Sequence, residues 1–275
     1  DKPKEEHILD AAYDNSVAVS FSMTLDNAAD AENLEVPVKV TLPVPETINP
    51  DFLVILHYKQ NGEVEELTLT DVHVFRKGST VYASFVLDSF SDFVMTNLSD
   101  EAIAQGVTGS VTWQVTGWGN LVLSGEGGTA HYWDGEDAPW TAYADRITNV
   151  VIEQGVTQIG ARVFSGLNNV TEITIPEGVE MLYDAFDNCL NLQTVYLPAS
   201  VVMNWGVGYN MFSNCPSLEN IYVAEGNPTF FDDDGVLMAV LHLEEDEYYL
   251  HAYPVGRKAA SYTVPDYVSG LDGAF

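Results

Sequence analysis

Clustered acidic side chains are the first candidates for chemistry in this sequence. Asp232, Asp233 and Asp234 are consecutive, and a second acidic run extends from Glu244 to Glu247. Carboxylate oxygens are the ligands that calcium prefers, but neither run has the ordered spacing of an EF-hand loop. We therefore favour acidic turns within a hairpin from Val236 to Tyr253. A calcium site at Asp232, Asp233 and Asp234 stays as the alternative, and no other cofactor is expected.

The remaining reactive side chains form no catalytic pattern. The histidines are scattered, with no ligand pair on one element that would predict zinc; they are His7, His57, His73, His131, His242 and His251. The sequence has no nucleophile elbow, phosphate loop or dinucleotide-binding motif. Paired carboxylates are unavoidable among 41 acidic residues, so they are poor evidence for a glycosidase. We predict a protein that is not an enzyme.

The two cysteines occupy equivalent places in a repeat described below. Cys189 and Cys215 each lie three residues after a phenylalanine, Phe186 and Phe212. A disulfide between them requires Cα atoms within about 7 Å. We favour buried free thiols, because cysteine packs well as a small hydrophobic residue.

The charge balance excludes whole classes of partner. The chain has 41 acidic and 10 basic residues, for a formal net charge of -31. Nucleic acid requires a basic stripe, yet only Arg146 and Arg162 lie between Lys77 and Arg257. Anionic membrane surfaces are disfavoured for the same reason, and no apolar run reaches the ~20 residues of a membrane span. The chain starts at Asp1 without a methionine or an apolar signal core, so we expect a signal peptide to have been removed.

The elements that position these residues differ between the two halves of the chain. From about Ser16 to Thr96, apolar and polar residues alternate in short runs such as Val36–Leu42 and Phe52–Tyr58. Asn61-Gly62 separates two such runs, as in a β-hairpin turn. This pattern predicts an antiparallel β-sandwich domain over residues 1–97.

This pattern resembles β-sandwich modules in surface proteins of Gram-positive bacteria. The resemblance rests on a V-x-V-x-L-P-x-P strand, an HY…NGEVEEL hairpin and a terminal SFSDF motif. Some related sandwiches cleave themselves at a His-Phe-Ser triplet, where serine attacks the preceding carbonyl and histidine is the base. The triplet here is Ser89-Phe90-Ser91. The base is missing, so we expect a last strand whose phenylalanines pack in the core.

After a polar segment, residues 98–109, that we interpret as a linker, the sequence becomes repetitive. Taking Phe164, Phe186 and Phe212 as origins, apolar residues recur six, nine and eleven positions later. The recurring residues are Val170, Ile173 and Ile175; Leu192, Val195 and Leu197; and Leu218, Ile221 and Val223. A fourth copy precedes them at Ile147, Val150 and Ile152, and a fifth follows from Tyr262 to Phe275. The origins are 22 and 26 residues apart, within the ~20–29-residue period of leucine-rich repeats.

Offsets nine and eleven place two side chains on one face of a short strand. One repeat cannot bury its apolar face alone, so neighbouring copies must stack into a parallel sheet. We predict a solenoid with short parallel strands and an irregular or short helical convex side over residues 110–275. Residues 110–145 are the expected N-terminal cap, residues 146–275 the repeats, and the last repeat is truncated at Phe275.

The copies AFDNCLNL and MFSNCPSL, each followed by a V-x-L-P type of strand, resemble the BspA-like (Treponema-type) leucine-rich repeats of bacterial surface proteins. The resemblance covers residues 106–275. It implies secretion or attachment to the cell surface and a role in binding rather than catalysis.

The exposed face of the strands is the candidate binding surface, because a solenoid's sheet usually contacts the partner. Its expected outward residues are Asn149, Val151, Glu172, Thr174, Thr194, Tyr196, Asn220 and Tyr222, with Thr263 in the fifth copy. We predict an extracellular protein partner. Glycan binding, through the tyrosines or exposed tryptophans, and a passive spacer remain as alternatives. For Trp113, Trp118, Trp133 and Trp140 we favour the core of the cap over a sugar platform.

Overall fold

The computed structural model describes residues 13, 18–22, 37–59, 61–68, 71–89, 91–133, 135–202, 211–242 and 247–271. The sequence predictions that concern His7, Phe90, Glu244, Glu245, Asp246 and Phe275 fall outside these residues. The chain divides into two compact units, Asp1–Ile103 and Ala104–Phe275. Both are built almost entirely from β-strands, as expected, and no helix among the described residues has the length and apolar character needed to cross a bilayer.

The first unit contains two antiparallel sheets. The first sheet has the strand order β1-β7-β3-β4 and the second β2-β6-β5. The elements are β1 (Val19–Ser22), β2 (Val38–Pro43), the 3-10 helix η1 (Pro50–Phe52), β3 (Leu53–Tyr58), β4 (Val64–Leu67), β5 (His73–Lys77), β6 (Thr80–Leu87) and β7 (Asp92–Asn97). The Asn61-Gly62 turn joins β3 to β4, with Gly62 in the left-handed conformation (φ 87°) that such turns require.

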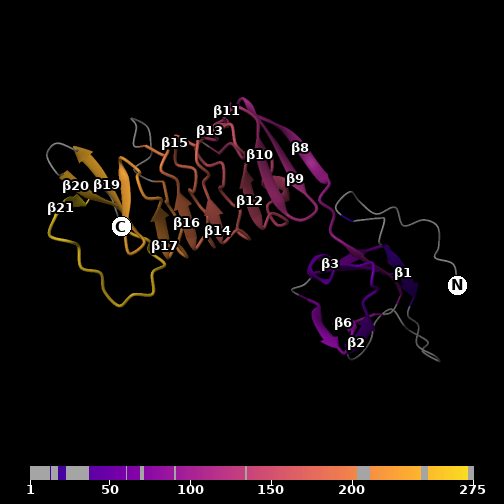
Figure 1. Cartoon of the computed structure of the whole chain (residues 1–275). Helices are drawn as coiled ribbons and strands as arrows, with labels where there is room; N and C mark the ends of the chain where they lie inside the picture. The colour runs from indigo at the N-terminus through magenta and orange to yellow at the C-terminus, as the bar shows by residue number, and fades with distance from the viewer. Residues whose placement is uncertain are drawn as a thin grey trace. The chain divides into compact units, whose positions relative to one another are not determined.

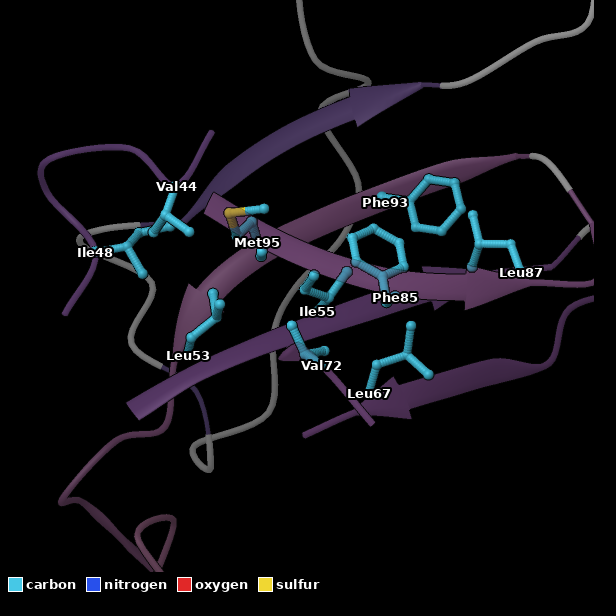
Figure 2. Packing of buried hydrophobic residues seen from close by; sticks show 11 residues of the cluster. Val44, Ile48, Leu53, Ile55, Leu67, Val72, Phe85, Leu87, Phe93 and Met95 are labelled. Atoms are coloured by element: carbon cyan, nitrogen blue, oxygen red, sulfur yellow. The ribbon is translucent and has the colours of Figure 1, made fainter. Parts of the chain in front are cut away.

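One apolar cluster joins the two sheets (Figure 2). Leu53 and Ile55 of β3 and Phe93 of β7 face Phe85 and Leu87 of β6. All five are buried, as strand alternation requires for a sheet with one face against a core. The all-β N-terminal portion is therefore confirmed. Its resemblance to the modules of Gram-positive surface proteins stays a prediction.

The segment that we interpreted as a linker contains a strand. β8 (Ala102–Thr108) is hydrogen-bonded to β9 (Val111–Thr116), with a turn at Gly109 (φ 60°) between them. A Cβ atom at Gly109 would lie 2.3 Å from the Gly128 carbonyl oxygen, so only glycine fits there. Small and polar residues at 98–109 therefore reflect an edge strand and a tight turn rather than an irregular connection.

The second unit is a β-solenoid of about 4 turns over residues 120–223, in which successive coils lie side by side (Figure 1). One row of strands consists of β10 (Asn120–Ser124), β12 (Asn149–Ile152), β14 (Glu172–Thr174), β16 (Thr194–Leu197) and β17 (Asn220–Val223). Within this row, β10 and β12 belong to one hydrogen-bonded sheet and β14, β16 and β17 to another. A second row of strands consists of β11 (Gly127–Gly128), β13 (Val156–Ile159) and β15 (Met181–Leu182). The pairings β10–β12, β14–β16, β16–β17, β11–β13 and β13–β15 are parallel.

The third side of each coil consists of turns, which confirms the irregular convex side. Phe164, Phe186 and Phe212 stack along it, with ring centroids 5.5 and 5.2 Å apart. Two residues after each phenylalanine the backbone enters the left-handed region, at Gly166 (φ 78°), Asn188 (φ 62°) and Asn214 (φ 54°). Glycine and asparagine tolerate this conformation best, which explains their recurrence at this offset.

The N-terminal end of the solenoid is covered by a compact aromatic group. Trp113 and Trp140 are buried with centroids 5.7 Å apart, and Trp140 Nε1 donates to the Val163 carbonyl oxygen at 3.0 Å. The 3-10 helix η2 (Thr141–Tyr143) follows Trp140 directly. Residues 110–145 also contribute a full coil, because Leu121 pairs with Val150 and Leu123 with Ile152.

The predicted fifth copy is wrong in its strand pairing. Residues 230–271 form the sheet β18 (Phe230–Asp233), β19 (Val236–His242), β20 (Glu247–Ala252) and β21 (Val268–Leu271), in that order. Tyr262 and Val264 pack on its core instead of extending the solenoid ladder, and Thr263 lies outside any strand. The physical reason is that the turn between β18 and β19 already occupies the free edge of β17.

Candidate functional site

The outward side chains of β12, β14, β16 and β17 form a surface that we call the strand face. It contains the predicted residues Asn149, Val151, Glu172, Thr174, Thr194, Tyr196, Asn220 and Tyr222. Strand pairing aligns Glu172, Thr194 and Asn220 in one row. A second row aligns Thr174, Tyr196 and Tyr222. Six of the eight residues are exposed, and Thr194 and Asn220 are half-buried.

The two tyrosines form a stacked pair at one end of the strand face. The ring centroids of Tyr196 and Tyr222 lie 5.4 Å apart with an angle of 27° between the ring planes. Each residue is 38% exposed. Neither hydroxyl has a hydrogen-bond partner among the described residues. Each ring covers one face of the other, and both side chains remain partly open to solvent.

On the other side of Tyr222, the edge of β17 is closed by the turn that contains Asp232, Asp233 and Asp234, which we call the acidic turn. The Ile221 amide donates to the Gly235 carbonyl oxygen, and the Val223 amide donates to Asp232 Oδ1, both at 2.9 Å. A free strand edge would otherwise expose these donors to pairing with another chain. Solenoid ends need such a cap.

The three aspartates of that turn have separate partners. Asp232 accepts the Val223 amide, Asp233 accepts the Tyr262 hydroxyl at 2.7 Å, and Asp234 pairs with Arg257 at 2.8 Å. Burial and the hydrogen bond to Asp233 raise the pKa of Tyr262. Calcium would need these carboxylates to converge on one point. Their divergence favours the acidic-turn interpretation over the calcium site.

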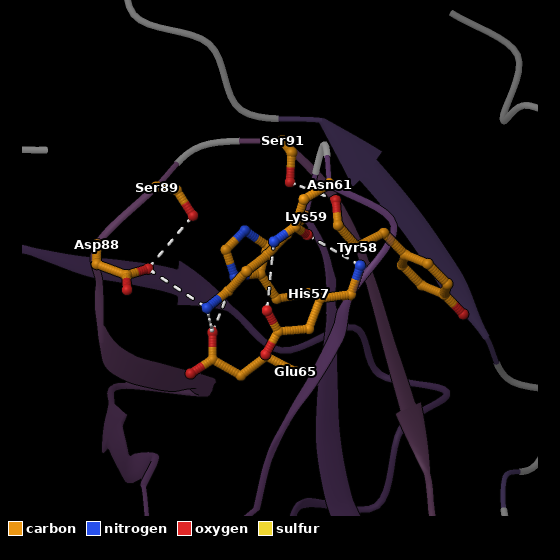
Figure 3. Close-up of polar contacts among 9 residues, drawn as sticks. His57, Tyr58, Lys59, Asn61, Glu65, Asp88, Ser89 and Ser91 are labelled. Atoms are coloured by element: carbon orange, nitrogen blue, oxygen red, sulfur yellow. Dashed lines mark hydrogen bonds and ion pairs between the residues drawn. The ribbon is translucent and has the colours of Figure 1, made fainter. Parts of the chain in front are cut away.

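Only one group of potential metal ligands converges among the described residues, and it lies in the first unit (Figure 3). The ligand atoms of His57, Glu65 and Asp88 lie within 4.8 Å of one another. Lys59 already supplies a cation there, with Nζ 3.2 Å from Glu65 Oε2 and 3.8 Å from Asp88 Oδ1. His57 is fully buried and stacks on Phe93 at 4.3 Å. The Lys59 ammonium thus lies between the two carboxylates, and the group forms an ion-pair network at the edge of the core.

The serines of the Ser89-Phe90-Ser91 triplet have ordinary polar contacts. Ser91 Oγ donates to the Tyr58 carbonyl oxygen at 2.5 Å, and Ser89 Oγ donates to Asp88 Oδ1 at 3.3 Å (Figure 3). The Ser91 contact ties the start of β7 to the end of β3, which gives Ser91 a structural role.

The two cysteines are free and buried, as expected. Cys189 Sγ donates to the Phe164 carbonyl oxygen at 3.1 Å, and Cys215 Sγ donates to that of Phe186 at 2.9 Å. Each thiol therefore bonds to the preceding coil. The hydrogen bond with Cys215 and burial raise the pKa of Cys189, which keeps this thiol protonated.

The prediction that all four tryptophans pack in the core of the cap is wrong for Trp118 and Trp133. Trp133 is 48% exposed and Trp118 is 38% exposed, whereas Trp113 and Trp140 are core residues. The Trp133 ring lies parallel to His131, which in turn contacts Tyr183. His131 and Tyr183 are 52 residues apart in the sequence, so no local motif connects them.

The parallel ladders, the stacked phenylalanines and the exposed strand face together define a leucine-rich-repeat solenoid. Within it, residues 142–233 match the family model of the BspA type leucine rich repeat region, in six copies. This part of the chain therefore consists of BspA-type leucine-rich repeats. No curated protein matches the chain.

Three solved structures resemble the chain at low identity. A leucine-rich repeat protein from Eubacterium ventriosum is 21% identical with a TM-score of 0.36, and the match covers 61% of this chain and 56% of that one. The pneumococcal vaccine antigen PcpA is 17% identical with a TM-score of 0.34, covering 61% and 60%. A leucine rich cell surface protein from Faecalibacterium prausnitzii is 18% identical with a TM-score of 0.30, covering 62% and 67%. The matched part of this chain thus spans just over half the length of the first of these proteins.

Surface proteins with BspA-like repeats are extracellular, bind extracellular partners and are generally not enzymes. The repeats in residues 142–233 agree with a non-catalytic extracellular repeat module.

Proposed function

We propose that this chain is a secreted or surface-attached adhesion module that binds an extracellular protein through the strand face. The stacked, exposed pair Tyr196 and Tyr222 is the observation that carries the proposal. Tyrosine provides a large, amphipathic contact area at a low entropic cost, and such residues often dominate binding energy at interfaces.

The backbone beneath the pair is rigid, which favours binding. β16 pairs with both β14 and β17, so Tyr196 lies on a central strand. The edge of β17 is closed by the acidic turn, so Tyr222 also lies on a strand with its amides bonded. A preorganised surface loses little freedom when a partner binds.

The extent of the strand face favours a protein partner over a sugar at this place. Its eight outward residues lie on four neighbouring strands, an area better matched to a protein surface than to one or two sugar rings. The hydroxyls of Tyr196 and Tyr222 suit backbone and side-chain groups of a protein. Glu172 is the one charged residue among the eight of the strand face, and the chain carries a net charge of -31. We therefore expect a partner that is neutral or basic around its contact area.

The test is binding of the purified chain to an array of extracellular matrix and bacterial surface proteins. For a detected partner, Tyr196→Ala and Tyr222→Ala should each raise the equilibrium dissociation constant about 30-fold, as expected for a contact worth ~2 kcal/mol. Tyr267→Ala is the matched control, because Tyr267 is 46% exposed but lies outside the strand face. Unchanged affinity in the Tyr196→Ala/Tyr222→Ala double variant would reject the strand face, and an array without any partner would favour a passive spacer.

A further inference from the structure

A second exposed surface of the solenoid, outside the strand face, brings three aromatic rings together. His131, Trp133 and Tyr183, which we call the aromatic ledge, bring three rings together from segments that follow β11 and β15. The Trp133 and His131 rings are parallel, at an angle of 9° and a centroid distance of 5.7 Å. Tyr183 meets His131 edge to face at 4.4 Å. Trp133, at 48%, is the most exposed tryptophan among the described residues.

Small residues in the intervening coil allow these rings to meet. Gly160 and Ala161 follow β13, between the coil of His131 and the coil of Tyr183. A Cβ atom at Gly160 would lie 2.0 Å from the Ala130 carbonyl oxygen, and Ala161 is fully buried. A larger residue at either position would push the coils apart. The ledge is therefore supported by three successive coils.

Hydrogen bonds fix the His131 ring and the backbone of Tyr132 and Trp133. The Ala161 amide donates to His131 Nδ1 at 3.1 Å, which requires Nδ1 to be unprotonated. The neutral imidazole then carries its proton on Nε2. The Tyr132 amide donates to the Ala161 carbonyl oxygen at 3.0 Å, and the Glu136 amide donates to that of Trp133 at 3.1 Å.

The ledge also offers polar groups beside the indole. His131 Nε2–H has no hydrogen-bond partner among the described residues. The Tyr183 hydroxyl has one contact there, a weak 3.9 Å interaction with Met181 Sδ. An aromatic ring with one open face, an N–H donor and a hydroxyl group is a combination that suits a sugar: its apolar C–H face packs on the indole and its hydroxyls bond to the polar groups.

We infer that the aromatic ledge is a binding site for a neutral polysaccharide. The surrounding charge selects against anionic glycans, because Glu136 and Asp137 are exposed just after Trp133 and the chain has a net charge of -31. Three side chains are too few for a stable protein interface, which usually buries more than about 1,000 Å². One or two sugar rings match the area of an indole and an imidazole. The site does not depend on the strand face.

The experiment is affinity electrophoresis of the full chain in native gels that contain a neutral polysaccharide. A mixed-linkage β-glucan, a galactomannan and glycogen are the neutral probes, and polygalacturonate is the anionic comparison. We expect at least one neutral polysaccharide to retard the chain, and polygalacturonate not to. Trp133→Ala should raise the dissociation constant obtained from the retardation about tenfold or more, the loss of affinity expected for one good aromatic stacking contact.

Three further variants make the outcome specific. Trp118→Ala is the matched control, because Trp118 is also exposed but lies outside the ledge, and it should be retarded like the unchanged chain. Tyr183→Phe keeps the ring and removes the hydroxyl, so it tests the ledge without a large cavity and should weaken retardation about threefold or more. The Tyr196→Ala/Tyr222→Ala variant should keep its retardation, which separates this site from the strand face. The inference is overturned if no neutral polysaccharide retards the chain, if only polygalacturonate does, or if Trp133→Ala and Tyr183→Phe leave retardation unchanged.

Discussion

The two units of this chain bury their cores by different routes. In the first unit, one cluster collects side chains from strands that are distant in sequence, such as Leu53 of β3 and Phe93 of β7. In the solenoid, Phe164 contacts Phe186, which contacts Phe212, and each coil packs on its immediate neighbours. The first arrangement couples all strands to a single core, whereas the second divides stability into terms between adjacent coils. The loss of one buried ring should therefore destabilise all the strands of the first unit, but only the neighbouring coils of the solenoid.

Phe93→Ala and Phe186→Ala form a matched pair that tests this difference. Both rings are fully buried, so each variant should lose about 3–5 kcal/mol of unfolding free energy. In Phe93→Ala, amide protection should fall together across β3, β6 and β7, because they share the core. In Phe186→Ala, the loss should concentrate in β14, β16 and β17 and leave β9 and β10 close to the unchanged chain.

Peptide-resolved hydrogen exchange measures both variants on one scale. Each variant also serves as the control for the other, since each unit has its own core and one mutation should spare the other unit. A uniform loss of protection over the whole solenoid in Phe186→Ala would contradict the neighbour-by-neighbour account. In Phe93→Ala, a loss of protection confined to β7 would contradict the expectation that the strands of the first unit share one core.

Asn188→Ala tests the turn geometry on which the stacking depends. Asn188 has φ 62°, and alanine in the left-handed region costs about 1–2 kcal/mol. Asn188 Oδ1 also accepts a 2.6 Å hydrogen bond from Asn214 Nδ2 of the next coil. The variant should therefore lower the melting temperature of the solenoid and leave that of the first unit unchanged.

Two variants separate the contributions at this position. Asn188→Gly keeps the left-handed backbone and removes only the side-chain bond, so it should cost less than Asn188→Ala. Gly166→Ala probes the equivalent position one coil earlier, where the added Cβ meets no atom within 4 Å and only the backbone is strained. If Asn188→Gly and Asn188→Ala lower the melting temperature equally, the loss of stability comes from the missing side-chain hydrogen bond and not from the backbone conformation.

The same contrast explains how much of the fold could be predicted from the sequence. Solenoid contacts repeat at fixed offsets, so Ile173, Val195 and Ile221 could be assigned to one ladder before any coordinates. The first coil was missed because Trp118 stands three residues before Leu121, where the other copies have Ile147, Val170, Leu192 and Leu218. The strand at Thr263 was wrong because an inserted hairpin sheet, not the next copy, meets β17.

The candidate sites divide in the same way. The strand-face residues follow from strand periodicity, and all eight predicted residues lie on the four predicted strands. Periodicity does not show that Tyr196 and Tyr222 stack rather than point apart. The aromatic ledge depends on the absence of side chains at Gly160 and Ala161, which lets distant rings touch. Because the contact is permitted by two small residues and not specified by a recurring motif, it could not be predicted from the sequence.

Asp184→Asn is the smallest predicted effect and concerns the cost of charge on the stacked coils. Asp184 lies in the turn before Phe186, and its Oδ1 atom is buried without a hydrogen-bond partner among the described residues. Burial, with a smaller contribution from the nearby charge of Asp187, raises the pKa of the Asp184 carboxyl above its usual 3.8. The folded state therefore favours the neutral form, and the ionised form present at neutral pH costs stability.

The sign of the pH dependence follows from the raised pKa. The stability that Asp184 contributes is fully present below pH 3.8 and is lost as the pH rises through the higher folded-state pKa. Asp184→Asn should thus raise the unfolding free energy of the solenoid at pH 7 by less than about 1 kcal/mol, because partial exposure screens the charge. Near pH 3 the variant and the unchanged chain should have equal stability. Denaturant titrations at both pH values measure the difference, and an asparagine variant that is less stable at pH 7 would show that the carboxylate has a favourable partner.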